Sequence, residues 1–334
     1  MTPMAELGLI PEDRDLVAGV RAGTRRALAK AITLVESTRA DHRERAAAVL
    51  DALLPHTGGS LRIGLTGVPG AGKSTFIEAF GLHLIEQGLK VAVLAVDPSS
   101  SRSGGSILGD KTRMERLCQA EAAFIRPSPA AGTLGGVAEK TREALLVCEA
   151  AGYDVVIVET VGVGQSETVV AGMTDVFVLL QLPNSGDDLQ AIKKGIMELA
   201  DVVIYNKADL DAMAAERAAM QMRSALSLLH PASPNWQPPV LRTSALRGEG
   251  IAEVWTTLQE FRDKLTASGE LADKRRRQSL DWMWQLIDAD LRHRFREHPA
   301  VKSALPQTTA AVADGGMTPT VAAHRLLNLM NRFF

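Results

Sequence analysis

The sequence predicts an α/β protein with a mainly parallel sheet, flanked by N-terminal helices and a C-terminal helical arm. Between residues 58 and 265, seven short runs rich in Val, Ile and Leu alternate with segments of helical periodicity. Runs that are apolar on both faces suit strands covered by helices on both sides, as in parallel sheets. The expected strands are 61–66, 91–96, 123–125, 155–158, 176–182, 202–205 and 240–243.

The two flanking segments carry helical patterns and no strand pattern. Residues 1–57 repeat apolar side chains at helical spacing and are expected to form an N-terminal helical extension. Residues 266–334 show two amphipathic helical patterns, joined by a Pro-, Ala- and Gly-containing connection over 298–316. The first and last parts therefore flank a central domain at 58–265. We expect the last part to form a homodimer through its apolar stripes, and packing on the chain's own central domain is the alternative.

The composition argues against several classes of function. The 334 residues carry 37 Lys and Arg against 39 Asp and Glu, a formal charge of −2. Such a chain has no overall field for a polyphosphate backbone, so we expect no nucleic-acid partner, and we interpret the basic run at 274–277 as a solvated helix face. No apolar stretch approaches the roughly 20 residues of a membrane span. Two cysteines and an N-terminus without a signal or transit pattern favour the cytoplasm.

One segment after the first expected strand matches a phosphate-binding loop. Gly67-Val-Pro-Gly-Ala-Gly-Lys73-Ser74 fits the pattern G-x-x-x-x-G-K-[ST], between a strand and a helix. Its glycines allow backbone N–H groups to surround phosphates at the positive end of a helix dipole. Lys73 would add a mobile charge, and the Ser74 hydroxyl suits Mg²⁺. The expected phosphate-site residues are Gly67, Val68, Pro69, Gly70, Ala71, Gly72, Lys73, Ser74 and Thr75.

Two later strand ends predict which base is bound. Asn206-Lys207-Ala208-Asp209 follows the sixth run, and a carboxylate there can accept hydrogen bonds from N1–H and N2–H₂ of guanine, which adenine does not offer. The same string is common as a helix cap, but its place at a strand end after a phosphate loop favours base recognition. At the end of the last run, a third base-contacting loop is expected to comprise Ser244, Ala245 and Leu246.

Carboxylates follow the second and fourth expected strands. Asp97 opens a Ser- and Gly-rich loop that reaches Asp110, and Glu159 follows the fourth strand. Phosphate-binding folds place the acidic group that holds Mg²⁺ at such strand ends. We therefore expect Ser74, Asp97, Asp110 and Glu159 to hold Mg²⁺, some of them through water. A turn or helix cap is the alternative role for Asp97 and Asp110.

Longer strings around these motifs resemble the MeaB/ArgK-type GTPases, the family that includes the methylmalonic aciduria type A protein. They include Gly104-Gly-Ser-Ile-Leu-Gly-Asp-Lys-Thr-Arg-Met114 and Val158-Glu-Thr-Val-Gly-Val-Gly-Gln-Ser-Glu167. The resemblance implies a homodimeric enzyme that hydrolyses GTP to GDP. It also implies association with adenosylcobalamin-dependent methylmalonyl-CoA mutase, where the GTPase gates cofactor loading and protects the mutase. The cobalamin adenosyltransferase is a further candidate partner.

The resemblance also implies catalytic positions in a third mobile switch. Residues 184–194 resemble a segment that responds to the partner, in which Gln190 and Lys193 are the expected functional residues. An ordinary capped helix start is the alternative. The full expected catalytic set is Lys73, Asp97, Asp110, Glu159, Gln190 and Lys193.

Two other functions are compatible with a phosphate loop. A P-loop kinase that transfers the γ-phosphoryl group to a small molecule or a protein would have the same phosphate site. A metal-insertion GTPase would normally concentrate His or Cys ligands, whereas the seven His of this chain are scattered and its two Cys are far apart.

Overall fold

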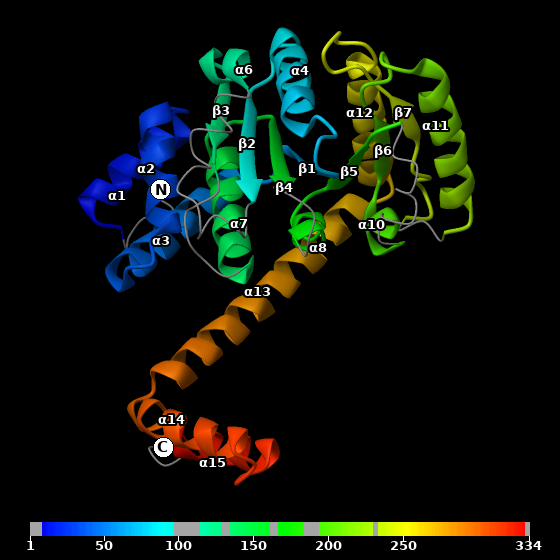
Figure 1. The fold of residues 1–334 in the computed structure, drawn as a ribbon. Helices are drawn as coiled ribbons and strands as arrows, with labels where there is room; N and C mark the ends of the chain where they lie inside the picture. Colours follow the sequence, from blue (N-terminus) through cyan, green and yellow to red (C-terminus); the bar gives the residue numbers. More distant parts are fainter. Residues whose placement is uncertain are drawn as a thin grey trace. The chain divides into compact units, whose positions relative to one another are not determined.

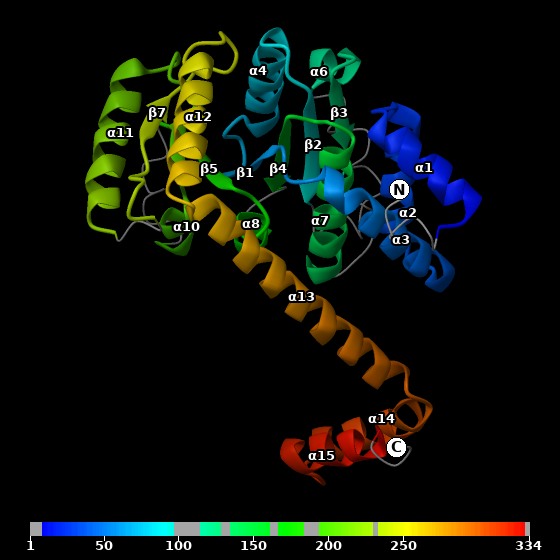
Figure 2. The same cartoon turned by 180° about the vertical axis from the view of Figure 1, so that it is seen from behind.

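The computed structural model describes residues 9–96, 114–127, 134–160, 166–183, 194–229 and 233–330. These residues belong to two compact units, Met1–Arg275 and Arg276–Phe334. The first unit contains a parallel sheet with helices on both sides (Figures 1 and 2). In the part of the chain that is described, no helix is both long and apolar enough to cross a membrane.

The sheet has seven strands in the order β3-β2-β4-β1-β5-β6-β7, and every neighbouring pair is parallel. The predicted α/β class is confirmed, because each expected run forms a strand. The strands are β1 (Leu61–Gly67), β2 (Val91–Val96), β3 (Ala123–Arg126), β4 (Val155–Thr160), β5 (Val176–Gln181), β6 (Val202–Tyr205) and β7 (Val240–Arg242).

Alternate residues of each strand enter different cores, which explains why the strands are apolar on both faces. In β4, Val155 and Ile157 face one core while Val156 and Val158 face another. The first core lies under α4 (Lys73–Glu86), α6 (Glu115–Gln119) and α12 (Ile251–Ala267). The opposite face is covered by α7 (Leu134–Ala150), α8 (Ser166–Ala171), α10 (Lys194–Leu199) and α11 (Ala212–Ser227).

The N-terminal helices pack on the same unit as the sheet. These helices are α1 (Pro11–Arg21), α2 (Arg25–Glu36) and α3 (Ala40–Leu53), followed by the short 3₁₀ helix η2 (Leu54–His56). Their apolar stripes, including the fully buried Leu28 and Ile32, share one core with α7 and the neighbouring strands. An ion pair joins α1 to α3, since the half-buried Arg45 donates two hydrogen bonds of 3.0 and 2.7 Å to the buried Asp13 carboxylate.

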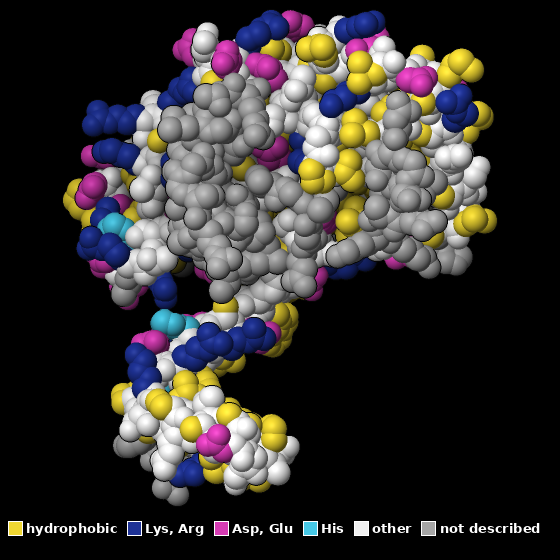
Figure 3. Space-filling model, viewed as in Figure 1, with side chains coloured by type: hydrophobic (Ala, Val, Ile, Leu, Met, Phe, Trp, Pro, Cys, Tyr) yellow, Lys and Arg dark blue, Asp and Glu magenta, His cyan; other side chains and the backbone are white. Residues whose placement is uncertain are grey.

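The second unit is helical and contains most of α13 (Glu270–Glu297), with α14 (Pro299–Ala313) and α15 (Pro319–Met330). The expected connection over 298–316 was wrong, because most of it forms α14. Pro299 occupies the first turn, where its missing N–H costs no helical hydrogen bond, and an Ala-rich sequence follows. Basic side chains and apolar ones both lie on the surface of this unit (Figure 3).

The first turns of α13 are bound to the amino end of β5 within the first unit. Arg275 donates to both carboxylate oxygens of Asp175 at 2.7 and 2.6 Å, and to the carbonyl oxygens of Gly58 and Ser60. Lys274 donates to the Asp175 carbonyl oxygen at 2.6 Å and approaches Asp201. The interpretation of 274–277 as a solvated face was therefore wrong for these two residues. Their long apolar stems let the charged ends reach buried acceptors.

We predict that Arg275→Leu destabilises the protein by about 3–5 kcal/mol, because it leaves the fully buried Asp175 carboxylate without its main counter-charge. Urea unfolding of the full chain measures the loss. The control is Arg277→Leu, the same change at an exposed arginine two residues later, which should cost less than about 0.5 kcal/mol. Equal losses in the two variants would contradict the assignment.

Candidate functional site

The phosphate loop connects β1 to α4, and three of its glycines are required for different reasons. Gly70 and Gly72 have φ of +82° and +85°, a backbone conformation that side chains with a Cβ rarely adopt. Gly67 has no room for a side chain, because an added Cβ would lie 2.3 Å from the Leu180 carbonyl oxygen on β5. The loop is thus shaped by the close approach of the neighbouring strand as well as by its own turns.

Lys73, the first residue of α4, lies across the opening of this loop. Its ammonium donates to the Gly67 carbonyl oxygen at 2.7 Å. Burial lowers the pKa of Lys73, while the nearby carboxylates of Glu159 and Glu167 partly offset that effect. A half-buried cation beside a turn of backbone N–H groups favours an anion of the size of a phosphate.

Glu159 lies at the carboxyl end of β4, where its backbone pairs with Leu65 of β1. Its side chain is buried and is close enough to Lys73 to stabilise the ammonium charge. The structure therefore brings Glu159 to the same edge of the sheet as Ser74, in the first turn of α4. The other expected catalytic and metal positions lie outside the described residues, namely Asp97, Asp110, Gln190 and Lys193.

Asn206 joins the phosphate loop to the two base-recognition loops. Its Nδ2 donates to the Ala71 carbonyl oxygen at 2.9 Å. Its Oδ1 accepts from the Thr243 hydroxyl at 3.1 Å and from the Ala245 N–H at 3.0 Å. Because Asn206 is only 1% exposed, these bonds form away from water and all of its side-chain polar atoms are used.

Lys207 follows in a left-handed conformation, with φ of +61°. This conformation costs a residue with a Cβ about 1–2 kcal/mol, so the surrounding contacts must hold it in place. The Ala208 N–H donates to the Thr243 carbonyl oxygen at 3.0 Å immediately afterwards. The turn directs the chain so that both Lys207 and Asp209 line one pocket.

This pocket has a volume of about 270 Å³ and suits a flat base with polar edges. Apolar side chains of Leu210 and Leu246 line it and are 74% and 83% exposed, while Asp209 is almost buried. A hydrogen bond from the Ser244 hydroxyl, with the charge of Arg247, lowers the pKa of Asp209. An ionised, acceptor-only carboxylate is what recognition of two donors on a base edge requires.

Several residues from different expected loops line this one pocket. Thr75 and Gly72 line the base pocket along with Asn206, Lys207 and Ala245. Two residues that the sequence analysis missed are Leu210, in the pocket wall, and Arg247, whose Nε lies 3.5 Å from the Asp209 carboxylate. Their positions directly after the base motifs were the available signal.

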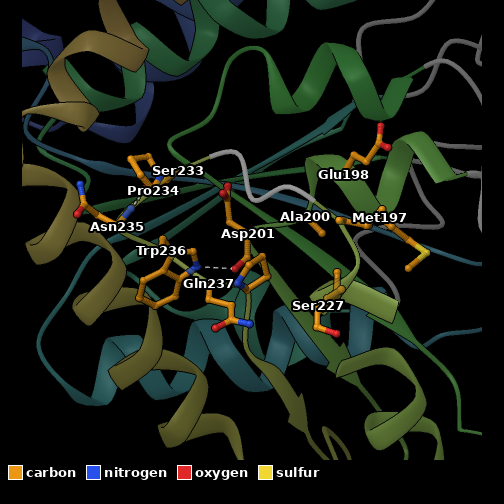
Figure 4. Close-up of a pocket in the computed structure, with 13 residues that line it drawn as sticks. Met197, Glu198, Ala200, Asp201, Ser227, Ser233, Pro234, Asn235, Trp236 and Gln237 are labelled. Atoms are coloured by element: carbon orange, nitrogen blue, oxygen red, sulfur yellow. Dashed lines mark hydrogen bonds between the residues drawn. The ribbon is translucent and has the colours of Figure 1, made fainter. Parts of the chain in front are cut away.

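A second cavity of about 400 Å³ lies near the amino end of β6, away from the carboxyl ends that carry the loops above (Figure 4). The Trp236 indole N–H donates to the Asp201 carbonyl oxygen at 2.8 Å at its wall. Burial raises the pKa of Asp201, and its carboxylate accepts from the Phe177 N–H at 2.9 Å. None of the described residues that line this cavity belongs to the expected nucleotide site.

We predict that Asp209→Asn weakens GTP binding by roughly 1–3 kcal/mol, or about 5- to 150-fold, because one acceptor oxygen becomes an NH₂ donor. Xanthosine nucleotides, which carry an acceptor at position 2 of the base, should bind the variant better than they bind the wild type. Calorimetric titration with GTP, XTP and ATP measures both changes. Asp211→Asn is the matched control, because Asp211 caps α11 and Asn caps equally well. Unchanged base preference in Asp209→Asn would exclude this role.

Comparison with known proteins supports the same assignment. The family model described as methylmalonyl-CoA mutase-associated GTPase MeaB matches residues 28–300. A Caulobacter vibrioides protein named putative GTPase is 58% identical over 306 residues, which is 92% of this chain and 94% of that protein. GTPase ArgK of Escherichia coli is 51% identical over 308 residues, covering 92% and 93%.

A mouse protein and one solved structure extend the comparison. The methylmalonic aciduria type A homolog of Mus musculus is 50% identical over 323 residues, covering 93% of this chain and 78% of that protein. A crystal structure titled LAO/AO transport system kinase is 42% identical, with a TM-score of 0.77 over 97% of this chain and 99% of the other. From the phosphate loop, the base pocket and these relationships, the chain belongs to the MeaB family and is a GTPase.

Proposed function

We propose that this GTPase is a Mg²⁺-dependent switch that associates with an adenosylcobalamin-dependent methylmalonyl-CoA mutase, gates loading of the mutase cofactor and protects the mutase. The observation that carries the nucleotide part is the Asn206 side chain, which holds the phosphate and base loops together. The family description, mutase-associated GTPase, supports the partner. The cobalamin adenosyltransferase is proposed as a second partner on the same family relationship.

We propose that Mg²⁺ binds at the carboxyl edge, where the described residues offer the Ser74 hydroxyl and the Glu159 carboxylate. A serine hydroxyl and carboxylates are the hard oxygen ligands that Mg²⁺ prefers. Glu159 is buried beside the cation of Lys73, so a further positive charge at this edge would be stabilised by the carboxylate. Ser74 and Glu159 would hold the ion together with Asp97 and Asp110, some of them through water. Bound Mg²⁺ would neutralise charge on the β- and γ-phosphates.

The phosphate loop supplies phosphate binding but offers no arginine that could stabilise charge during hydrolysis. Lys73 and the loop backbone would bind the β- and γ-phosphates, and the loop positions Val68, Pro69 and Ala71 offer no charged side chain. Gln165, which lies outside the described residues, stands three residues after Gly162 in the sequence, a spacing that differs from Ras-like proteins. We therefore propose that hydrolysis is slow in the isolated protein and faster with the mutase.

The second unit supports the proposal of a homodimer. Four apolar residues of α13 recur at helical spacing and are between 38% and 56% exposed, namely Leu280, Met283, Ile287 and Leu291. Trp284 is 61% exposed on the same stripe. A stripe of this kind on a helix favours burial against another apolar surface. A two-fold pairing of identical chains is the commonest closed solution.

We predict that purified protein releases inorganic phosphate from GTP and transfers none to a small molecule or protein. The name of the solved relative, a transport system kinase, makes kinase activity the specific alternative. Radiolabelled γ-phosphate distinguishes the two outcomes. Adding the mutase should raise the rate, and Lys73→Ala should lower turnover by at least about 100-fold because it removes charge from the phosphate site.

The matched control for that experiment is Lys90→Ala, which removes an exposed lysine outside the site. A labelled acceptor molecule would favour the kinase. A rate of many turnovers per second without any gain from the mutase would contradict the switch. Co-purification of the mutase with this chain, with and without a non-hydrolysable GTP analogue, tests the partnership directly.

We predict that removing residues 276–334 gives a monomer that still binds GDP. This end point is chosen because Lys274 and Arg275 contact the first unit and should be kept. Light scattering of the full and shortened proteins measures their mass, and a fluorescent GDP analogue measures binding. A shortened protein that remains dimeric would show that the second unit does not form the dimer.

A further inference from the structure

Gln181, the last residue of β5, has a buried amide with no hydrogen-bond partner in the described protein. Its side chain is 1% exposed, and neither Nε2 nor Oε1 is paired. Buried amides are normally paired, because burying unpaired donors and acceptors opposes folding. The buried amide of Gln181 therefore carries a free-energy cost that a hydrogen-bonding partner would remove.

The main chain at Gln181 lies where the phosphate loop meets the base-recognition loops. The preceding residue, Leu180, pairs with Gly67 and leaves no space for a Cβ there. The carbonyl oxygen of Gln181 itself accepts from the Asn206 N–H at 2.9 Å. The main chain around Gln181 thus contacts Gly67, the first residue of the phosphate loop, and Asn206, which joins the two base-recognition loops.

The side chain of Gln181 points to the opposite face of the sheet from Leu180. Strand residues alternate, so Gln181 shares its face with Phe177 and Leu179, which pack under α8 and α10. At this end of the same face, the hydroxyls of Thr66 and Thr160 are paired with each other at 2.8 Å. The carboxyl ends of β4, β1 and β5 therefore place the polar side chains of Thr160, Thr66 and Gln181 on this face. Of these three described side chains, only that of Gln181 is unpaired.

We propose that Gln181 is a positioning residue that couples nucleotide occupancy to the junction of these loops. A bound nucleotide contacts both loops beside Gln181, and the amide gains a hydrogen-bonding partner at this edge when the nucleotide is bound. The pairing then contributes to nucleotide affinity, because the nucleotide-bound arrangement relieves a cost that the nucleotide-free protein carries. This inference rests on the proposed nucleotide site but assigns a role to a residue outside its pocket.

The test replaces the amide by an apolar group of similar volume, Gln181→Met, in the full chain. Two quantities are measured: the urea midpoint of the nucleotide-free protein and the Kd of a fluorescent GTP analogue. We expect the midpoint to rise, because the unpaired amide is gone, and the Kd to increase about 10-fold, because its pairing is lost. A change that only loosened packing would lower the midpoint.

Leu179→Met is the matched control, since it changes packing on the same face of β5 without removing a polar group. It should leave the Kd within about two-fold of the wild type. Gln181→Leu is a second variant that removes the amide if methionine disturbs folding. An unchanged Kd in a folded Gln181 variant, or a lowered midpoint in both, would overturn the proposal.

These outcomes are distinct from failure of the proposed function. Loss of GTP binding by the wild-type protein would refute the nucleotide site and with it this inference. Normal wild-type binding, with Asp209→Asn altering base preference and Gln181→Met leaving the Kd unchanged, would refute the role of Gln181 alone.

Discussion

The proposed nucleotide site depends on one buried side-chain amide, that of Asn206, which connects its loops. The proposed phosphate loop and the first proposed base loop lie more than 130 residues apart in the chain. The Asn206 side chain holds these loops together through hydrogen bonds to Ala71, Thr243 and Ala245. Since these bonds are shielded from water, removing the Asn206 side chain would leave the Ala71 carbonyl, the Thr243 hydroxyl and the Ala245 N–H each without this partner, which is costly for buried groups.

The sheet order puts this amide where it can act. β1 lies between β4 and β5, so the chain leaves β1 towards one side of the sheet and later crosses to the other. Crevices at such switch points, beyond the carboxyl ends of the strands, are where open α/β sheets bind ligands. The left-handed turn at Lys207 and the glycines at positions 67, 70 and 72 are local consequences of fitting three loops into one crevice.

The sequence predicted the strands well because burial on both faces leaves an unambiguous apolar run. It also predicted that the motifs after β1 and β6 follow strand ends, since each motif is contiguous with its strand. It did not predict α14, where two prolines suggested a break that the first-turn position of Pro299 avoids. Nor could it place Arg275 or Gln181, because their significance comes from what lies opposite them in space. The sequence of a charged run, or of a glutamine at a strand end, does not reveal whether its side chains have hydrogen-bonding partners in the fold.

Strand β5 has a further consequence for how the protein responds to force. Asp175, which directly precedes β5, accepts two hydrogen bonds from Arg275 at the start of α13. Gln181, the last residue of β5, accepts a hydrogen bond from the Asn206 N–H. Six strand residues span about 20 Å. Hydrogen bonds to β1 and β6 on either side oppose sliding along that axis. A force applied to the start of α13 would therefore pull β5 along its own axis. The flanking hydrogen bonds would resist this sliding, and the force would reach the proposed nucleotide loops at the other end of the strand.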